Sequence, residues 1–490
     1  MKRSCGILMH ITALPSPYGI GTLGKEAEKF ADWLKSAGQK YWQVLPIGPT
    51  GYGDSPYQPF SSFAGNPLMI DLDQLVEDGY LTKAACEAAD FGADPSYVDF
   101  EKVSATRNQL LHEAFKSFTD DVGFTSFTIK EADWLDDYAL FAALKDKFGG
   151  KPWTKWDDDI KLREPEAVQR YTEELRDEIH YIKFVQYIFS RQWDNFHRYC
   201  NKNGISIIGD IPIYVSPDCA DVWAQPELFE LDERRDPRRV AGVPPDYFSA
   251  TGQLWGNPLY NWEEMKNTNY AWWIKRVKKS TEQYDMLRID HFRAFDTYYA
   301  IPFGEKTAEH GTWENGPGMD LFNAIKAELG DVNIIAEDLG DIFDSVKVLL
   351  KESGFPGMRV FQFGFNPEHN DNDHLPHHYP ENSVAYTGTH DNATIMQWYK
   401  EADPQSREMA KNYLRKGLFE KLNMAFIRCV YASPSNLAII PMQDALGLGK
   451  EGRMNVPSTL GGNWNWRMKQ GALKPALAHK LKSLAESYLR

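Results

Sequence analysis

The sequence predicts an α/β protein built on a closed (β/α)8 barrel of the TIM type. Eight short apolar runs each end abruptly in polar residues, and from the third run onward helical patterns lie between them. Such alternation implies a parallel sheet, and eight units favour a closed barrel over an open, doubly wound sheet. No G-x-G-x-x-G motif follows the first run, which argues against a dinucleotide-binding fold. The predicted strands are Gly6–Ile11, Tyr41–Ile47, Ile205–Val215, Met286–His291, Val332–Asp338, Met358–Phe363, Ser383–Thr387 and Leu437–Met442.

The barrel is expected to occupy the whole chain, residues 1–490, with large insertions in the loops after strands 2 and 3. The first insertion, residues 66–175, is predicted to be mainly helical because its apolar residues recur at helical spacing. The helices predicted between strands 2 and 3 are Asp71–Leu81, Lys102–Phe118, Glu131–Phe148 and Glu166–Tyr199, of which the last belongs to the barrel.

The second insertion, residues 216–280, is rich in proline, glycine and tryptophan. Its segment 244–258 reads PPDYFSATGQLWGNP and is predicted to be a loop. Long loops inside a compact domain are usually either functional or disordered. The aromatic and glycine content of this segment favours a functional lid over a disordered linker.

Composition narrows the possible partners and the compartment. The net charge of −15 argues against nucleic acid and anionic membranes as partners, because both attract basic surfaces. No apolar segment is long enough to cross a bilayer. His10 and Pro15 interrupt the apolar N-terminal run, so we expect a first strand there and not a signal peptide. The five cysteines are scattered without a C-x-x-C motif, which fits a reducing cytoplasm and supports neither a disulfide framework nor a zinc site.

Arg288 and Asp290 stand two positions apart on the fourth predicted strand. Because side chains alternate along a strand, both charges point to the same face. A neighbouring arginine lowers the pKa of an aspartate and keeps it ionised, as a nucleophile or an electrostatic stabiliser requires. An isolated Arg-x-Asp pair is nevertheless more often an ordinary structural ion pair.

Polar residues also follow the other predicted strands, and the active sites of barrels lie at the carboxyl ends of their strands. Several carboxylates should therefore converge on one rim, although each alone could cap a helix or form a salt bridge. Like charges held together in a pocket destabilise a fold, and that cost usually marks function. The other residues expected at this rim are His10, Asp210, His291, Glu337, Asp338, His390, Asp391, Gln443 and Asp444.

Carboxylates without a metal-binding motif suggest glycosyl transfer, which uses one ionised and one protonated carboxylate at the scissile bond. Asp290, next to an arginine, suits the ionised nucleophile. Glu337 suits the acid, because neighbouring anions and a partly apolar strand end raise its pKa. Asp391 would be a third carboxylate, which could bind sugar hydroxyls together with His390.

No metal ion and no other cofactor is predicted. His374, His377 and His378 are close in the sequence, but they lie on a proline-rich acidic loop after the sixth predicted strand. Metal sites need ligands whose geometry is fixed by the surrounding structure. We therefore expect these histidines to lie at the loop surface or to contact substrate.

Eight short motifs occur in order along nearly the whole chain. They are GDSPYQPFSSFAGNP at Gly53–Pro67, GDIPIYV at Gly209–Val215, PPDYFSATGQLWGNPLY, RIDHFR, AEDLG, GTHDN, GRMNVPST at Gly452–Thr459 and GGNWNWR at Gly461–Arg467. By this ordered set the chain resembles the 4-α-glucanotransferases (amylomaltases or disproportionating enzymes). These enzymes form glycoside hydrolase family 77, a family related to the α-amylases.

The resemblance implies a retaining, double-displacement enzyme that transfers α-1,4-glucan segments. The donor would be a malto-oligosaccharide or a glucan derived from starch or glycogen, and the acceptor 4-hydroxyl would belong to another glucan or to glucose. Asp290 matches the family's nucleophile, Glu337 its general acid/base and Asp391 its transition-state stabiliser. Substrate contacts are implied for Arg288, His390, Asp210, Tyr57, Asp246, Trp255, His291 and Asn463, with Asp246 and Trp255 in the substrate-covering loop.

Two other functions remain open at this point. A hydrolase on the same barrel would use the same carboxylates, and a non-catalytic α-glucan-binding protein would need only the rim. The predicted lid and the end-to-end resemblance favour transfer. The presence of Asp290, Glu337 and Asp391 together counts against a protein that has lost catalysis.

Overall fold

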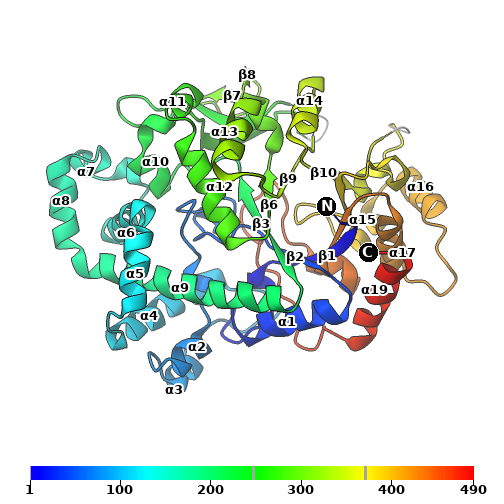
Figure 1. Cartoon of the computed structure of the whole chain (residues 1–490), viewed down its shortest axis with the longest axis horizontal. Coiled ribbons are helices and arrows are strands. Elements are labelled where there is room, and N and C mark those ends of the chain that lie inside the picture. The colour runs from blue at the N-terminus through cyan, green and yellow to red at the C-terminus, as the bar shows by residue number, and fades with distance from the viewer. Residues whose placement is uncertain (1, 246–248, 341, 369–371) are drawn as a thin grey trace.

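The computed structural model describes residues 2–245, 249–340, 342–368 and 372–490 and has a closed barrel at its centre (Figure 1). Eight parallel strands follow one another in the order β1-β12-β11-β10-β9-β6-β3-β2. Each predicted apolar run overlaps one of these strands, so the predicted (β/α)8 barrel is confirmed. The strands are β1 (Ser4–Leu8), β2 (Tyr41–Gln43), β3 (Ser206–Pro212), β6 (Met286–Asp290), β9 (Ile334–Ala336), β10 (Gly357–Val360), β11 (Ser383–Tyr386) and β12 (Leu437–Pro441).

The barrel strands are buried because helices cover them on the outside and side chains fill the inside. All residues of β1 and β12 are buried, as expected for parallel strands covered by helices. Inside the barrel, the Tyr386 hydroxyl of β11 donates to Oε1 of Gln43 on β2 at 2.9 Å. The helices associated with the barrel are α1 (Lys25–Ser36), α9 (Arg176–Lys202), α12 (Ala271–Gln283), α13 (Met319–Leu329), α14 (Asp344–Ser353), α15 (Ile395–Glu401), α16 (Pro404–Leu414), α17 (Leu422–Ala432), α18 (Met442–Leu446) and α19 (Pro475–Ser487).

Between β2 and β3 the chain forms a group of helices at one side of the barrel (Figure 1). Several of them pack on α9, a helix of 27 residues that leads into β3. The stretch Glu166–Tyr199, expected to be one helix, instead belongs to α8 and α9, which are separated at Leu175 (φ −100°, ψ 20°). No proline or glycine marks this break, so the apolar spacing runs through it. The helices before α9 are α2 (Leu72–Glu77), α3 (Lys83–Ala88), α4 (Phe100–Ser117), α5 (Val122–Lys130), α6 (Ala132–Lys147), α7 (Asp158–Lys161) and α8 (Pro165–Glu174).

A second sheet, with antiparallel strands in the order β5-β4-β7-β8, was not predicted from the sequence. Its strand β5 occupies the end of the segment 244–258, so the expectation of a loop is corrected there. β5 forms because β4 provides an antiparallel partner, with Gly242 opposite Leu254; its own glycine, asparagine and proline hide the strand pattern. The boundaries of the two insertions, 66–175 and 216–280, stay a prediction. The remaining elements are α10 (Ala220–Ala224), β4 (Arg239–Val243), β5 (Gln253–Pro258), α11 (Trp262–Asn267), β7 (Thr297–Pro302) and β8 (Thr312–Asn315).

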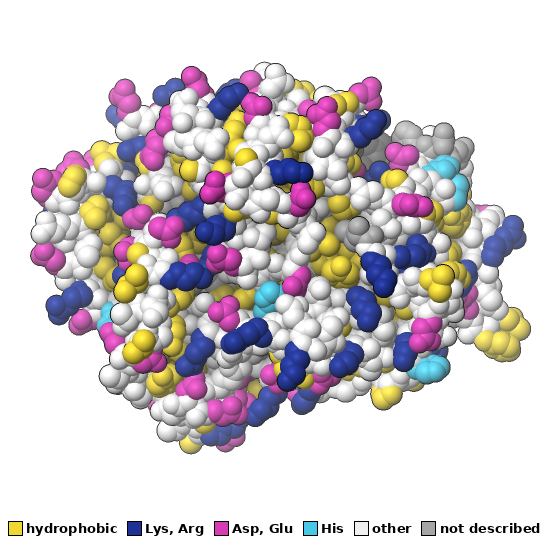
Figure 2. All heavy atoms as spheres, viewed as in Figure 1, with side chains coloured by type: hydrophobic (Ala, Val, Ile, Leu, Met, Phe, Trp, Pro, Cys, Tyr) yellow, Lys and Arg dark blue, Asp and Glu magenta, His cyan; other side chains and the backbone are white. Residues whose placement is uncertain are grey.

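The surface carries charges of both signs. Figure 2 shows Asp and Glu side chains intermingled with Lys and Arg side chains over one face of the molecule. Across the described ranges, each helix is either too short or too polar to cross a membrane. The face in Figure 2 is therefore mixed in charge, although the chain as a whole has a net charge of −15.

The hydrogen bond inside the barrel gives a test of its packing. Tyr386→Phe leaves Oε1 of buried Gln43 without its donor, so the free energy of unfolding should fall by about 1–3 kcal/mol. Tyr41→Phe is the matched control, because the partly buried Tyr41 hydroxyl has no hydrogen-bond partner among the described residues. Chemical denaturation of both variants measures the difference. Equal stability of the two variants would contradict a structural contribution from this bond.

Candidate functional site

Strand register brings four charged side chains together at the carboxyl end of the barrel. Asp210 on β3 lies opposite Arg288 on β6, and Ile289 on β6 lies opposite Ala336 on β9. Glu337 is the first residue after β9, and its N–H donates to the carbonyl of Ile289 at 3.1 Å. Glu337 therefore follows β9 at the level where Asp290 ends β6, so three neighbouring strands supply the group.

Arg288 is buried, with 3% of its side chain exposed, and it bridges two aspartates. Its Nη1 donates to both carboxylate oxygens of Asp210, at 2.9 and 2.7 Å. Its Nη2 donates to Oδ1 of Asp290 at 2.8 Å. Burial raises the pKa of Asp210, whereas the charge of Arg288 and the Tyr57 hydroxyl, which donates to Asp210 Oδ2 at 2.8 Å, oppose that rise. The Arg-x-Asp pair is thus part of a network that also spans β3.

Asp290 is the more open of the two aspartates. Its side chain is 28% exposed, compared with none for Asp210. Arg288 donates only to Oδ1 of Asp290. In the described part of the structure, no other side chain donates to Oδ2. One carboxylate oxygen is therefore held beside a permanent cation, and the other is free to react with a ligand at the rim.

Glu337 lies in a different environment from Asp290. The residue is 8% exposed, and its two carboxylate oxygens accept the N–H groups of His291 (2.7 Å) and Leu339 (2.8 Å). Burial, followed by the negative charge of Asp290, raises the pKa of Glu337 to about 8, against the opposing effects of Arg288 and the two N–H groups. This shift favours the protonated form of Glu337, which is the state that a general acid needs.

The third predicted carboxylate, Asp391, lies beyond β11 and is held by two neighbours. Asn455 Nδ2 donates to Asp391 Oδ1 at 2.7 Å, and His390 Nε2 is 3.4 Å from Oδ2. The His390 ring is stacked on Tyr57, with centroids 5.1 Å apart and an interplanar angle of 14°, and Trp464 packs against both rings. Burial lowers the pKa of His390, while Asp391 opposes this effect. The ring cluster therefore positions a neutral imidazole beside a partly exposed carboxylate.

Two rings lie beside the charged residues of the rim. Trp255 comes from strand β5 of the second sheet, and His291 directly follows β6. Their rings meet edge to face at 4.8 Å and 85°, and Tyr214 lies within 6.5 Å of both. Burial lowers the pKa of His291 to about 3, so this imidazole is neutral. The Trp255 ring thus contacts a residue whose main chain holds Glu337. Asp246, predicted to contact substrate from the same segment, lies outside the described residues.

The segment 455–464 supplies two site residues that were not singled out from the sequence, Asn455 and Trp464. Both lie within the motifs GRMNVPST and GGNWNWR, so the signal was present in the chain. Asn463, which was singled out, uses its side chain inside this segment. Its Nδ2 donates to the carbonyl and hydroxyl oxygens of Thr459, both at 3.1 Å, and its Oδ1 accepts the Val456 N–H at 3.0 Å.

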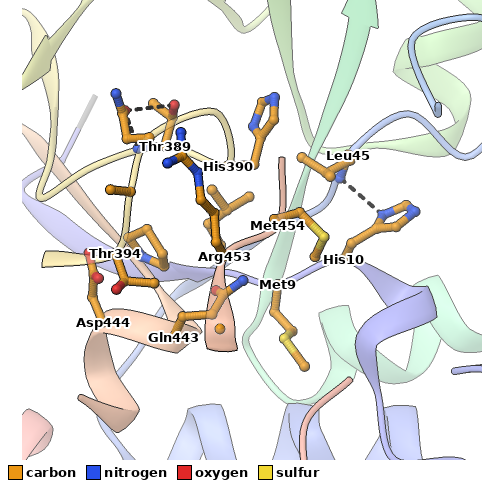
Figure 3. A pocket seen from close by; sticks show the side chains of 15 residues that line it. Met9, His10, Leu45, Thr389, His390, Thr394, Gln443, Asp444, Arg453 and Met454 are labelled. Carbon is orange, nitrogen blue, oxygen red and sulfur yellow. Dashed lines mark hydrogen bonds between the residues drawn. The ribbon is translucent and has the colours of Figure 1, made fainter. Parts of the chain in front are cut away.

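His10 and Asp444 were predicted at the rim, but both are buried and form hydrogen bonds inside the protein. His390, His10 and Asp444 line a small pocket with a volume of about 20 Å³. Figure 3 shows how these side chains lie. Nδ1 of His10 accepts the Leu45 N–H at 3.3 Å, and burial lowers the pKa of His10 to about 3. Asp444 accepts the Thr387 hydroxyl at 2.6 Å. The volume suits a single water molecule, so His10 and Asp444 support the rim from inside the barrel.

Asp338 and His374, one histidine of the predicted cluster, form hydrogen bonds with residues of β10. Asp338 accepts from Arg359 Nη1 at 3.0 Å and from the Met358 N–H at 2.6 Å, which ties the end of β9 to β10. Nδ1 of His374 accepts the Val360 N–H at 3.1 Å. Within the described ranges, no group of three or more His, Cys, Asp and Glu side chains is arranged to hold a metal ion.

Known proteins match the chain over its whole length. The model of the family described as 4-alpha-glucanotransferase matches residues 9–473. The chain is 48% identical to the 4-alpha-glucanotransferase of Clostridium butyricum over 486 residues, which cover 98% of this chain and 100% of that protein. It is also 48% identical to the 4-alpha-glucanotransferase of Streptococcus pneumoniae over 494 residues, covering 100% and 98%. The chain belongs to the 4-alpha-glucanotransferase family.

Solved structures of two amylomaltases agree with this assignment. The amylomaltase of Streptococcus agalactiae, solved in complex with acarbose, is 43% identical and covers 100% of both chains, with a TM-score of 0.97. The amylomaltase of Corynebacterium glutamicum is 17% identical, with a TM-score of 0.79 over 99% of this chain and 75% of that chain, and supports the fold alone. The predicted family, its glucan-transferring activity and the barrel are confirmed. The roles of individual residues stay predictions.

The contact between Asn455 and Asp391 gives a test of the site. Asn455→Ala should lower kcat/KM for maltotriose disproportionation about tenfold or more, since a hydrogen bond to a charged group contributes about 1.5–3 kcal/mol. Asn455→Asp should lower it further, because a second anion would face Asp391. Asn382→Ala is the control: its amide donates to the carbonyl of Gly354, before β10 and away from the rim. Full activity of Asn455→Asp would contradict a role in positioning Asp391.

Proposed function

We propose that Asp290 is the nucleophile, Glu337 the general acid/base and Asp391 the transition-state stabiliser of the transfer reaction. The observation that carries this proposal is the contrast between two neighbouring carboxyl groups. Asp290 has one oxygen on Arg288 and one oxygen free, whereas burial and the charge of Asp290 raise the pKa of Glu337 and favour its protonated form. Pairs of carboxyl groups whose environments separate their pKa values are typical of glycosidic bond cleavage.

The first half of the reaction breaks the donor's glycosidic bond. Oδ2 of Asp290 attacks the anomeric carbon while Glu337 transfers its proton to the bridging oxygen, which leaves as a free hydroxyl. The product is a covalent glucosyl-enzyme. As positive charge develops on the sugar ring, the carboxylate of Asp391 stabilises it, and the Asn455 amide keeps that carboxylate in place.

The second half returns the sugar to an acceptor with retained configuration. Glu337, now ionised, takes the proton from an acceptor 4-hydroxyl, whose oxygen attacks the anomeric carbon and displaces Asp290. Water competes with the acceptor, so transfer requires a site that excludes water and positions the glucan. We assign this role to the segment 244–258, whose strand β5 carries Trp255 to the ring of His291.

The proposed substrates are malto-oligosaccharides and α-1,4-glucans derived from starch or glycogen, with glucose as acceptor or product. Tyr57, His390, Asp210 and Arg288 line the same rim and are proposed to contact sugar hydroxyls and ring faces. We also propose a cytoplasmic location, in keeping with five cysteines that are buried and free in the described structure. The net charge of −15 supports neither nucleic acid nor a membrane as a partner.

Incubation with maltotriose separates transfer from the alternative functions. Transfer produces longer oligosaccharides together with glucose, hydrolysis produces only shorter sugars, and a binding protein leaves maltotriose unchanged. Asp290→Asn should reduce turnover by roughly three orders of magnitude or more, since the nucleophile cannot be replaced by its neighbours. Asp331→Asn, at an exposed salt bridge to Lys326, is the control and should keep full activity. Substantial turnover by Asp290→Asn would overturn the assignment of the nucleophile.

The pH dependence tests the assignment of Glu337. The donor step needs protonated Glu337, whose pKa is raised to about 8, so kcat/KM should fall as the pH rises through about 8. Because the carboxyl group of Glu337 interacts with that of Asp290, the alkaline decline describes the pair and not one residue alone. The measurement is kcat/KM for maltotriose against pH, with the Tm recorded at each pH as a control for folding. A profile with no alkaline decline would contradict the role of Glu337.

A further inference from the structure

A large cavity of about 620 Å³ lies away from the candidate catalytic carboxyl groups, between the N-terminal ends of α17 and α19, helix α18 and the C-terminal segment. Helices α17 and α19 pack against one another near the end of the chain (Figure 1). Ligand sites commonly enclose about 300–1,000 Å³, so this cavity has the size of a small-molecule site. None of Asp290, Glu337 and Asp391 lines it.

The cavity is strongly basic in an acidic protein. Five cationic side chains line it, and Glu451 is its one acidic lining residue among those described. The four lysines of this set are exposed, and none forms a salt bridge with any described residue. Their charges therefore repel one another, and Glu451 is the one acidic residue of the described lining that opposes this repulsion. The cationic residues are Lys421, Arg467, Lys469, Lys474 and Lys480.

Two helix N-termini add to this positive potential. Lys421 is the N-cap residue of α17, and Lys474 is the N-cap residue of α19. In the described structure, neither helix has a capping side chain or an acidic residue in its first turn. Helix N-termini carry unpaired N–H groups and a partial positive charge, which favour anions and disfavour lysine. Residues at the start of both helices line the same cavity, so an anion there would lie near positive helix ends.

Arg467 is a buried cation in the wall of this cavity and a second, independent feature that favours an anion. It is only 5% exposed, it lines the cavity, and no described carboxylate is paired with it. Its Nη2 donates to the carbonyls of Ser16 (2.6 Å) and Leu14 (3.3 Å), while Nε has no acceptor in the described structure. Burial lowers the pKa of Arg467 to about 10. A buried guanidinium without a counterion is costly, and a bound anion would supply one.

The rest of the wall is apolar and includes an aromatic ring. Met424, Leu448, Leu477 and the largely buried Trp466 line the cavity together with the cations. An inorganic anion alone would leave this apolar wall uncovered. A ring compound that carries an anionic group would satisfy both parts of the lining. Phosphate binds helix N-termini and Arg and Lys side chains through the same contacts that this cavity offers.

We propose that this cavity is a binding site for a phosphate monoester of a small ring compound, with the phosphate at the N-termini of α17 and α19. The shared chemistry is the phosphate dianion and an adjoining ring, which a sugar phosphate and a nucleoside monophosphate both provide. Because the second pKa of a phosphate ester is about 6, the proposal requires tighter binding above that pH than below it.

Isothermal titration and thermal shift measurements on the full chain test the proposal. The probes are glucose 1-phosphate, adenosine monophosphate, inorganic phosphate and glucose, all at one ionic strength because such contacts weaken with salt. At least one ester should bind and raise the Tm, inorganic phosphate should bind more weakly than that ester, and glucose should not bind here. The stronger of the two esters identifies the ring. Absence of binding by both esters would overturn the proposal, and so would equal binding of inorganic phosphate and the ester.

Charge variants locate the binding. Lys421→Gln with Lys474→Gln should weaken binding roughly tenfold or more, because two charge-assisted contacts are removed. Lys421→Glu with Lys474→Glu should abolish it while keeping the fold, since a carboxylate suits a helix N-terminus. Lys155→Gln with Lys400→Gln removes two exposed lysines outside the cavity and should leave the affinity unchanged. Equal losses in the cavity and control variants would indicate a non-specific charge effect and overturn the site. Turnover of maltotriose, measured in every variant, confirms that the barrel is intact.

Discussion

The buried guanidinium of Arg288 is the interaction on which the candidate site depends. It holds Asp210 from β3 and Asp290 from its own strand, and both carboxylates rely on this one cation. Breaking a buried ion pair leaves an uncompensated charge, at a cost of about 3–5 kcal/mol. The register of β3 against β6 is therefore tied to the chemistry, because a shift by one residue would turn Arg288 away from Asp210.

The two carboxyl groups proposed for catalysis acquire different properties from their surroundings. Asp290 ends its strand beside Arg288 and is partly exposed at the rim. Glu337 is buried after the next strand and bound by main-chain N–H groups, so the charge of Asp290 disfavours a second anion there. Identical functional groups can thus serve as nucleophile and acid because burial and neighbouring charge separate their pKa values.

The C-terminal segment 451–467 links two regions of the molecule. Asn455 and Trp464 face the carboxylates and rings of the rim. Trp466 and Arg467, a few residues later, line the basic cavity beside α17 and α19. One stretch of chain therefore positions a proposed catalytic carboxylate on one side and the buried guanidinium of Arg467 on the other. The second sheet plays a comparable part, since its strand β5 brings Trp255 to the site from outside the barrel.

The barrel, and the positions of Asp290, Glu337 and Asp391 at or after the ends of their strands, could be predicted from the sequence. Apolar runs and the polar residues that follow them are local features of the chain. The strand β5 and the bond between Arg288 and Asp210 could not be predicted, since each depends on a partner elsewhere in the chain, and no proline or glycine marks the break at Leu175. The sequence by itself determined the fold class, the family motifs and which residue types stand at the strand ends. Only the tertiary structure decided which of these side chains meet, which are buried and which remain free. Register, desolvation and charge pairing arise only when strands far apart in the chain pack side by side.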